Sequence, residues 1–379
     1  MSSLGKSIRS ELRGDTAIWL ITIVLALVSI LAVYSSTGSM AFRVKNGNTE
    51  FFLMKHMMIV TVSFIIMYIM YKIPYENYKK WAPFFLALSI PMLIYTLAQG
   101  EDINDARRWI AVPFIDLTFQ TSDFAKLALI TYIASAIGSK QEYIDDFATA
   151  FRSILFPILL ICCLIALADL SSAIILFVTC FIMMFVGRVN WKFLALLVFS
   201  GIVLFAILII ISQFVPDFSR VDTWTSRLNE FLLNSEGGYQ VQQSKIAIAS
   251  GEWIGVGPGN STQRNLLPSP FADFIYAIIT EEYGLIGAVI MIIMFLWLFA
   301  RVTILVKKSE KAFGAMLAVG FATCLTVQAF VNIAVSVHLL PVTGVTMPLV
   351  SMGGTSFIFA SMMIGIILSV SRHIESIHD

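Results

Sequence analysis

The residues that could do chemistry in this sequence are ionisable side chains set in or beside strongly apolar stretches. They include Asp123, Lys126, Asp169, Asp273 and Glu281. An ionisable side chain inside a membrane span costs about 2.5–3.5 kcal/mol on insertion scales, so it usually marks a functional site or a paired charge. Each of these residues is therefore a candidate catalytic or ligand-binding group, and a purely structural role is the alternative for each.

Asp273 is the strongest candidate for a catalytic group. It follows a Pro-Ser-Pro turn at 268–270, where a loop ends and an apolar helix begins. Partial removal from water raises the pKa of a carboxyl group there, which suits a general base. The alternative is an aspartate that caps a helix N-terminus. Glu281 lies about 80° further round an ideal helix, so we expect it to approach the same cavity, whereas Glu282 points to another helix.

Two neighbouring features offer positive charge. Asp123 and Lys126 are three residues apart and share a helical face, so they form a structural ion pair unless Lys126 binds a substrate phosphate. Both interpretations stay open. Arg107 and Arg108 precede Trp109 after the third apolar stretch, where this cluster either anchors the chain at the membrane interface or binds an anionic head group.

Two runs of small residues allow close approach of the backbone. The run 255–261 is rich in glycine, and its exposed N–H groups suit a ligand. It is weak as a phosphate motif because no strand precedes it, and a tight turn is the alternative. The run 348–356 opens the last apolar stretch, where small residues usually indicate close helix packing.

Composition places the chain in a membrane. Of 379 residues, 58% are hydrophobic and 13% are charged, and the mean hydropathy is +0.85. A soluble domain carries about 25% charged residues, so this chain has too little polar surface to face water. The net charge of +1 gives no reason to expect a nucleic-acid partner. All four cysteines stand in apolar stretches, where inert thiols are expected: Cys162, Cys163, Cys180 and Cys324.

Ten apolar stretches predict an all-α, polytopic membrane protein with a single domain over residues 1–379. They cover residues 16–36, 52–72, 82–98, 121–138, 153–168, 170–187, 193–214, 272–300, 313–337 and 351–371. Several approach the ~20 residues that cross a hydrocarbon core. Lys and Arg gather in the short loops of one side, which predicts that both termini are cytoplasmic. Residues 215–271 then form one long external loop.

The order of several short motifs is more specific than any one of them. They are Gly14-Asp15, Ala106 to Trp109, Phe119 to Lys126, Asp169-Leu170, Gly238 to Ser244, Gly255 to Gln263, Asp273 to Ala277, Glu281 to Gly287, Leu340 to Gly344 and Pro348 to Ser356. This set resembles the SEDS family (shape, elongation, division and sporulation), and within it the cell-division branch. Thr121 and Asp123 stand where the family usually has Pro and Glu, and the departure affects local backbone geometry.

The resemblance implies a peptidoglycan glycosyltransferase that polymerises lipid II, an undecaprenyl-pyrophosphoryl disaccharide-pentapeptide, with inversion. Asp273 matches the family's essential aspartate, whose implied role is general base for the acceptor 4-hydroxyl. Lys126, Arg107 and Arg108 are the implied cations for the pyrophosphate. No cofactor is assigned, and a divalent cation (Mg²⁺ or Mn²⁺) held partly by acidic residues stays an alternative, because the sequence shows no metal cage.

The resemblance also implies partners and a location. The expected partners are a class B penicillin-binding protein that cross-links the product, other division proteins, and membrane lipids, without nucleic acid. The expected location is the bacterial inner membrane at the division septum. We expect the 215–271 loop to be the element that moves when the transpeptidase binds.

The candidate substrate-binding residues are the polar or flexible members of these motifs. They are Lys126, Arg107, Arg108, Gln120, Ser122, Asp169, Lys245, Gly257, Gly259, Asn260, Ser261, Glu281, Ser351 and Ser356. Two other functions stay open. A lipid II flippase would depend on acids in mid-membrane, such as Asp169 or Glu281, more than on Asp273. A non-catalytic division scaffold would tolerate replacement of Asp273.

Overall fold

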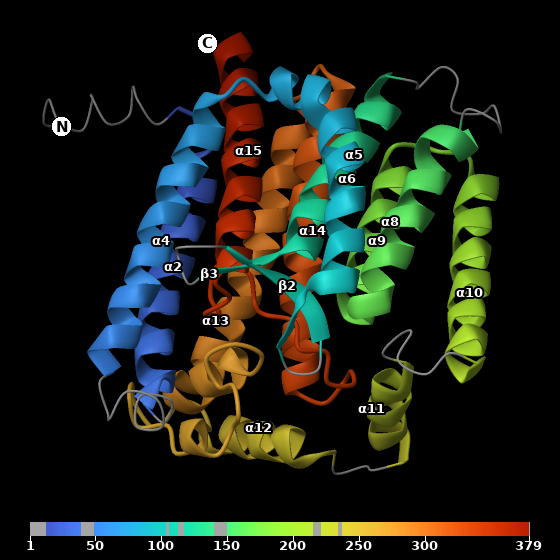
Figure 1. Ribbon diagram of the computed structural model, residues 1–379. Helices are drawn as coiled ribbons and strands as arrows, with labels where there is room; N and C mark the ends of the chain where they lie inside the picture. Colours follow the sequence, from blue (N-terminus) through green and yellow to red (C-terminus); the bar gives the residue numbers. More distant parts are fainter. Residues whose placement is uncertain are drawn as a thin grey trace, which may run out of the picture.

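The structure is a computed structural model that describes residues 13–38, 49–103, 106–112, 117–139, 150–214, 221–233 and 237–378. Its long helices run side by side in one bundle (Figure 1). They are α2 (Thr16–Ser36), α4 (Thr49–Lys72), α5 (Tyr75–Gln99), α6 (Thr121–Ser139), α8 (Phe156–Ala168), α9 (Leu170–Val186), α10 (Trp191–Phe214), α13 (Ile275–Val306), α14 (Ala312–Ser336) and α15 (Thr355–His378). Each predicted apolar stretch is therefore helical, which confirms the all-α class.

Apolar length supports a multi-pass membrane protein. Within the described residues, eight helical segments are long and apolar enough to cross a membrane, one of them formed by the π-helix η1 (Phe151–Leu155) together with α8. The helix α9 is apolar but shorter. The helix α6 has 19 residues and carries Asp123 and Lys126. The number of spans and the side of each terminus stay predictions.

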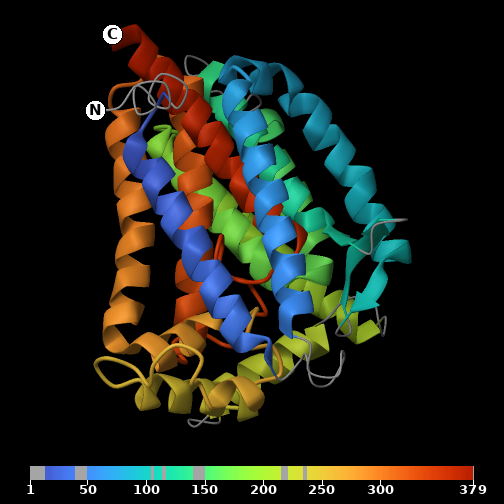
Figure 2. The ribbon, with the colours of Figure 1, turned by 90° about the vertical axis from the view of Figure 1, so that its left-hand side faces the viewer.

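The core of the bundle is formed by the helices that the chain reaches last. In the most apolar 18-residue window of each helix, 78% of the residues are buried in α14, 78% in α15 and only 17% in α10. The helix α10 accordingly stands at one edge of the bundle, and α2 and α4 stand at the opposite edge (Figures 1 and 2). Residues on α14 and α15 thus have the most protein around them.

Two shorter helices cover one end of the bundle. They are α11 (Val221–Leu233) and α12 (Tyr239–Ser250), and both belong to the predicted external loop. Figure 1 shows both at the lower end, where α12 lies across the ends of the long helices. Part of the 215–271 loop is therefore helical in the structure.

A three-stranded antiparallel sheet interrupts the helical pattern between α5 and α6. Its strands are β1 (Glu101–Ile103), β2 (Ala106–Val112) and β3 (Leu117–Gln120), in the order β1-β2-β3. Trp109 pairs with Gln120 in the β2–β3 register. The sequence did not predict these strands. Their pairing places Arg108 and Gln120 beside the start of α6.

The helix α13 is broken at Gly284, where the sequence predicted an uninterrupted span over 272–300. Gly284 has φ 67° and ψ −166°, so the segments before and after it are separate helices. Residues of the preceding loop bind the main-chain groups that the break leaves open. Val256 N–H donates to Glu281 O at 2.9 Å, and Leu285 N–H donates to Glu252 O at 2.9 Å. The break therefore has its hydrogen bonds completed by the loop.

The glycine run is explained by this contact. Gly255 has φ +89°, and a Cβ atom built on it would lie 2.2 Å from the carbonyl oxygen of Glu282. Only a residue without a side chain lets the two backbones approach so closely. Gly255 is thus required by the fold, and the predicted tight turn follows it, because Asn260 N–H donates to Gly257 O at 3.2 Å. A ligand contact of the run stays a prediction.

The two ends of the described chain meet at the other end of the bundle. Asp15 accepts a hydrogen bond from Ala17 N–H at 2.9 Å and so caps α2. Its carboxylate also pairs with Arg301 of α13 at 2.6 Å, and its backbone N–H donates to Ser371 Oγ of α15 at 2.7 Å. Three helices are therefore joined at one residue.

Candidate active site

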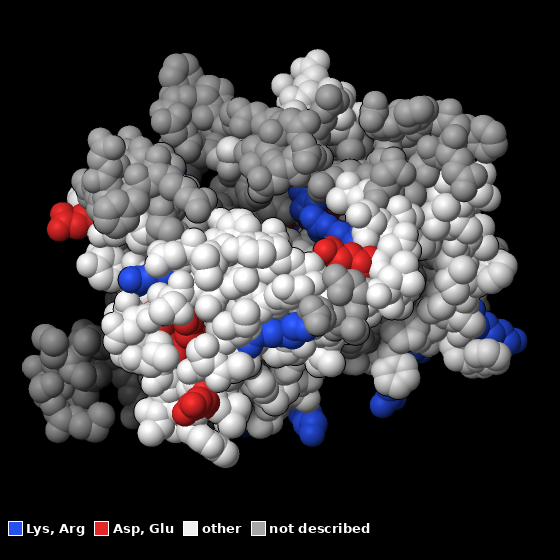
Figure 3. Space-filling model, turned by 90° about the horizontal axis from the view of Figure 1, so that it is seen from below, with Lys and Arg blue, Asp and Glu red and all other residues white. Residues whose placement is uncertain are grey.

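A polar cavity of about 540 Å³ lies between the bundle and α11. Its lining comes from β2, β3, α6, α9, α11 and α14, from the segment 269–273 and from the segment 343–356. The charged lining residues are three cations, Arg108, Lys126 and Arg227, and three carboxylates, Asp123, Asp169 and Asp273. Figure 3 views the end that carries α11 and α12, where basic and acidic atoms meet at a hollow in a mostly uncharged face.

Asp273 stands at the wall of this cavity, two residues before α13 begins. Burial raises the pKa of its carboxyl group to about 6, and the charges of Arg108 and Arg227 act in the opposite direction. No side-chain hydrogen bond caps α13, whose N-cap is Phe274. The helix-capping interpretation of Asp273 is therefore wrong, and a carboxyl group with a pKa near neutrality is left facing the cavity.

Asp273 is held by the segment that precedes α15. Ser351 Oγ donates to Ala272 O at 2.7 Å, and Met352 N–H donates to Phe271 O at 2.9 Å. Asn332 of α14 donates through Nδ2 to the carbonyl oxygen of Asp273 at 2.8 Å. These bonds fix the backbone on both sides of the carboxyl group and leave its oxygens free of the main chain.

Asp123 and Lys126 form a buried ion pair at one side of the cavity. Lys126 Nζ lies 2.6 Å from Asp123 Oδ1, and both side chains are about 5% exposed or less. Ser356 of α15 donates to the other carboxylate oxygen of Asp123. Gln120 donates through Nε2 to Ser122 Oγ at 3.0 Å, beside the same pair. The structural ion pair exists, and Lys126 also lines the cavity, so a contact with a ligand stays open.

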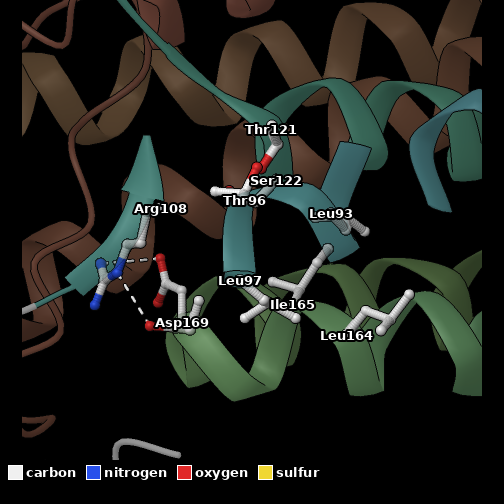
Figure 4. Close-up of a pocket in the computed structure, with 10 residues that line it drawn as sticks. Leu93, Thr96, Leu97, Arg108, Thr121, Ser122, Leu164, Ile165 and Asp169 are labelled. Carbon is white, nitrogen blue, oxygen red and sulfur yellow. Dashed lines mark hydrogen bonds and ion pairs between the residues drawn. The ribbon is translucent and has the colours of Figure 1, made fainter. Parts of the chain in front are cut away.

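Arg108 and Asp169 form the second ion pair of the cavity (Figure 4). Arg108 Nη1 lies 3.1 Å from Asp169 Oδ2, and Arg108 Nε donates to Ala168 O at 3.1 Å. Asp169 also caps α9, because Ser172 N–H donates to its Oδ1 at 3.2 Å. The strand β2 is thereby fastened to the junction of α8 and α9.

The structure gathers six of the predicted site residues around one cavity and places the others elsewhere. Asp273, Lys126, Arg108, Gln120, Asp169 and Ser356 line it. Ser351 and Ser122 form hydrogen bonds with residues of the lining, namely Ala272 and Gln120. The side chain of Arg107 lies outside the described part of the structure. Lys245 lies on α12. Gly257 and Gly259 belong to the loop against the break in α13, and the exposed Asn260 donates to Val256 O within it.

The prediction that Glu281 approaches the cavity of Asp273 is wrong. Glu281 accepts hydrogen bonds from Thr262 N–H at 3.0 Å and from the hydroxyl of Ser261. The two carboxylates would share a helical face only if Asp273 continued the helix, whereas the chain before Ile275 is a turn. Glu281 and Ser261 therefore hold the loop on α13. Glu282 does meet another helix, as predicted, through Ser35 of α2.

Two site residues were not predicted. Arg227 of α11 lines the cavity and donates through Nη1 to Val342 O at 3.1 Å. Asn332 supports Asp273 from α14. The helical spacing of Trp224, Arg227 and Leu228 in the sequence indicates the helix α11. It does not indicate that this helix lies over the cavity. Among the described residues no group of three or more His, Cys, Asp and Glu side chains could hold a metal ion, so no metal ligands are assigned.

Comparisons with known proteins agree on one family. The family model of the FtsW/RodA/SpoVE cell cycle proteins matches residues 15–376. A probable peptidoglycan glycosyltransferase FtsW from Pasteurella multocida is 33% identical over 96% of this chain and 91% of its own length. Stage V sporulation protein E from Bacillus subtilis is 30% identical over 95% of this chain and 97% of its own length.

Solved structures share the fold. A chain of a peptidoglycan synthase complex, described in terms of coordinated polymerisation and crosslinking, superposes with a TM-score of 0.74 at 21% identity, covering 95% of this chain and 98% of that one. The crystal structure of the rod shape determining protein RodA from Thermus thermophilus gives a TM-score of 0.68 at 21% identity, covering 95% and 97%. At this identity the likeness concerns the fold alone.

Proposed function

Because this chain belongs to the FtsW/RodA/SpoVE family of cell cycle proteins, we propose that it is a peptidoglycan glycosyltransferase that polymerises lipid II during septal wall synthesis. The observation that supports this most is Asp273, a carboxyl group with a pKa of about 6 in a cavity with three cations. Polymerisation of a pyrophosphate-linked sugar requires both a base and positive charge for the leaving group.

The proposed reaction is a single displacement with Asp273 as the general base. The ionised carboxylate takes the proton from the acceptor sugar 4-hydroxyl while that oxygen attacks the anomeric carbon of the donor. The bond from the anomeric carbon to the phosphate oxygen breaks, and its electron pair leaves with the lipid pyrophosphate. Attack from the opposite face inverts an α-linked donor into a β-linked product, so no covalent enzyme intermediate is needed.

The rest of the cavity serves binding in this proposal. Arg108 and Lys126 are held by Asp169 and Asp123, which fixes their positions at the cavity wall. A divalent cation (Mg²⁺ or Mn²⁺) remains an unassigned alternative for charge compensation. We also propose that the chain works in the septal membrane with other division proteins and with a class B penicillin-binding protein that cross-links the strands.

The test is glycan polymerisation from purified lipid II by the purified protein with its cognate transpeptidase. Wild type is compared with Asp273→Ala and Asp273→Asn, after equal thermal stability and equal partner binding are established. We expect a loss of about 10²–10⁴-fold or more in both variants, because a general base contributes a factor of this size. Equal polymerisation by wild type and both variants would remove Asp273 from the chemistry. No product from wild type would favour the flippase or scaffold functions, to be separated by measuring lipid II translocation.

A further inference from the structure

We propose that Arg227 of α11 binds the pyrophosphate of the lipid-linked donor and acts on the leaving group. This rests on the proposed function, since it names the residue that recognises one part of that substrate. It differs from the sequence analysis, where Lys126, Arg107 and Arg108 were the candidates. The three cations of the cavity differ in how many of their hydrogen-bond donors and how much of their charge already have partners within the protein.

The other two cavity cations are already neutralised. Arg108 pairs with Asp169 and donates to the carbonyl oxygen of Ala168. Lys126 pairs with Asp123 at 2.6 Å in a buried position. To bind a phosphate strongly, either cation would share its charge with a carboxylate that stays in place. Their first role in this structure is therefore to hold the cavity together.

Arg227 has no such carboxylate partner among the ion pairs of the described residues. Its Nη1 donates to Val342 O at 3.1 Å, which orients the guanidinium group from one side. A guanidinium group has five N–H donors in a planar fork, so most of them remain for a ligand. The fork matches two phosphate oxygens at once, which a lysine ammonium does not.

The guanidinium group of Arg227 and the carboxyl group of Asp273 line the same cavity. Burial lowers the pKa of Arg227, and so does the positive charge of Arg108, while Asp169, Asp273 and Glu230 act in the opposite direction. The charges of the two arginines and of the proposed base thus interact electrostatically within the same cavity. An anion between the arginines would relieve their repulsion and the unfavourable burial of charge.

The charge of the cavity also changes with the reaction in the required sense. With all lining groups ionised, three cations balance three carboxylates. Once Asp273 has taken the proton of the acceptor hydroxyl, one positive charge is uncompensated. The pyrophosphate gains negative charge in the same step, because the electron pair of the broken bond moves onto its oxygen. Arg227, which has no carboxylate of its own in the described structure, can then compensate that charge.

Binding of the released lipid tests this without chemistry. The full-length protein in detergent is titrated with undecaprenyl pyrophosphate and, separately, with undecaprenol, which has the same chain and no phosphate. We expect Arg227→Gln to weaken undecaprenyl pyrophosphate binding by about 10- to 100-fold, with undecaprenol binding unchanged. The affinity of Arg227→Lys for undecaprenyl pyrophosphate should lie between those of wild type and Arg227→Gln, because lysine keeps the charge and lacks the planar fork of donors.

The control is Arg264→Gln, which also removes an arginine from the loop region. Arg264 donates to Ser35 O at 2.9 Å and stands outside the cavity lining. The Arg264→Gln variant should still bind undecaprenyl pyrophosphate more tightly than undecaprenol, as wild type does. Unchanged undecaprenyl pyrophosphate binding in Arg227→Gln overturns the proposal, and so does an equal loss for both lipids. These outcomes are independent of polymerisation, so an inactive wild type would refute the proposed function and still leave the binding comparison decisive for Arg227.

Discussion

At the scale of single residues, the proposed role of Asp273 as a base requires its ionised form. Burial places the pKa of its carboxyl group at about 6, so the ionised fraction rises with pH through that value. We expect the polymerisation rate at saturating lipid II to rise with pH up to about 7 and then level off. Below its pKa the rate should fall about tenfold per pH unit, as for any single base that must be ionised.

Initial rates measured between about pH 5 and pH 8 check this expectation. The control is thermal stability over the same range, which separates titration of the base from unfolding. A rate that stays level down to pH 5 would mean that Asp273 keeps an ordinary acidic pKa, or that another group takes the proton. In the Arg227→Lys variant, which keeps the positive charge, the midpoint should stay near that of wild type.

The sequence was sufficient for some site residues because charge contrasts with an apolar background. Asp273, Lys126 and Asp169 stand out by residue type alone, and all three line the cavity. Arg227 has polar neighbours and therefore no such contrast. Its place depends on a hydrogen bond to Val342, 115 positions later, which no local pattern encodes. For most other candidates, roles in binding remain predictions.

At the scale of elements, the positions of the long helices followed from hydropathy, and the irregular elements did not. The sheet β1-β2-β3 has strands of three, seven and four residues, too short for a periodic signal. The break in α13 was also missed. A glycine inside an apolar helix pattern is common, and the loop that completes the break lies some thirty positions earlier, at Glu252 and Val256.

Glycines of the loop allow a prediction for this element. Gly255→Ala should destabilise the protein clearly, because its Cβ would lie 2.2 Å from the Glu282 carbonyl oxygen and its φ is +89°. The matched control is Gly259→Ala, with φ +77° and no atom within 4 Å of the added Cβ. Backbone strain alone costs roughly 1–2 kcal/mol, and only Gly255→Ala adds a clash with main-chain atoms.

Thermal unfolding in detergent measures the difference between the two variants. We expect the unfolding temperature to fall further for Gly255→Ala than for Gly259→Ala. Polymerisation should fall with it, since the same loop adjoins the helix that follows Asp273. Equal effects of both substitutions would mean that the loop does not approach α13 as closely as described.

At the scale of the whole molecule, the two ends of the described chain lie together, and the candidate active-site cavity lies toward the opposite end of the bundle. The ends of α2, α13 and α15 meet at Asp15, whereas α11 and α12 cover the other end (Figure 1). Basic residues in the short loops predicted that the Asp15 end is cytoplasmic. The cavity would then open toward the outer leaflet, where lipid II presents its head group.

This orientation predicts that cysteines introduced at two positions are accessible from opposite sides of the membrane. Glu310→Cys lies between α13 and α14, and Leu266→Cys lies in the loop before Asp273, where Leu266 is 48% exposed. In intact cells whose outer membrane is permeable to it, a thiol reagent that does not cross the inner membrane should modify only Leu266→Cys. The chain without added cysteines controls for its native thiols. Modification of Glu310→Cys alone would invert the proposed topology.

The loop contact with α13 has a consequence for how this protein could be switched on. Residues 252–257 supply main-chain hydrogen bonds to a helix gap, where the two backbones are in close contact. Pulling this stretch away would leave bare donors and acceptors, so it behaves as part of the rigid frame. Any opening caused by a transpeptidase is therefore confined to the chain before Gly251. We expect α11, together with Arg227, to be the element that moves, and the end of α12 to be the hinge.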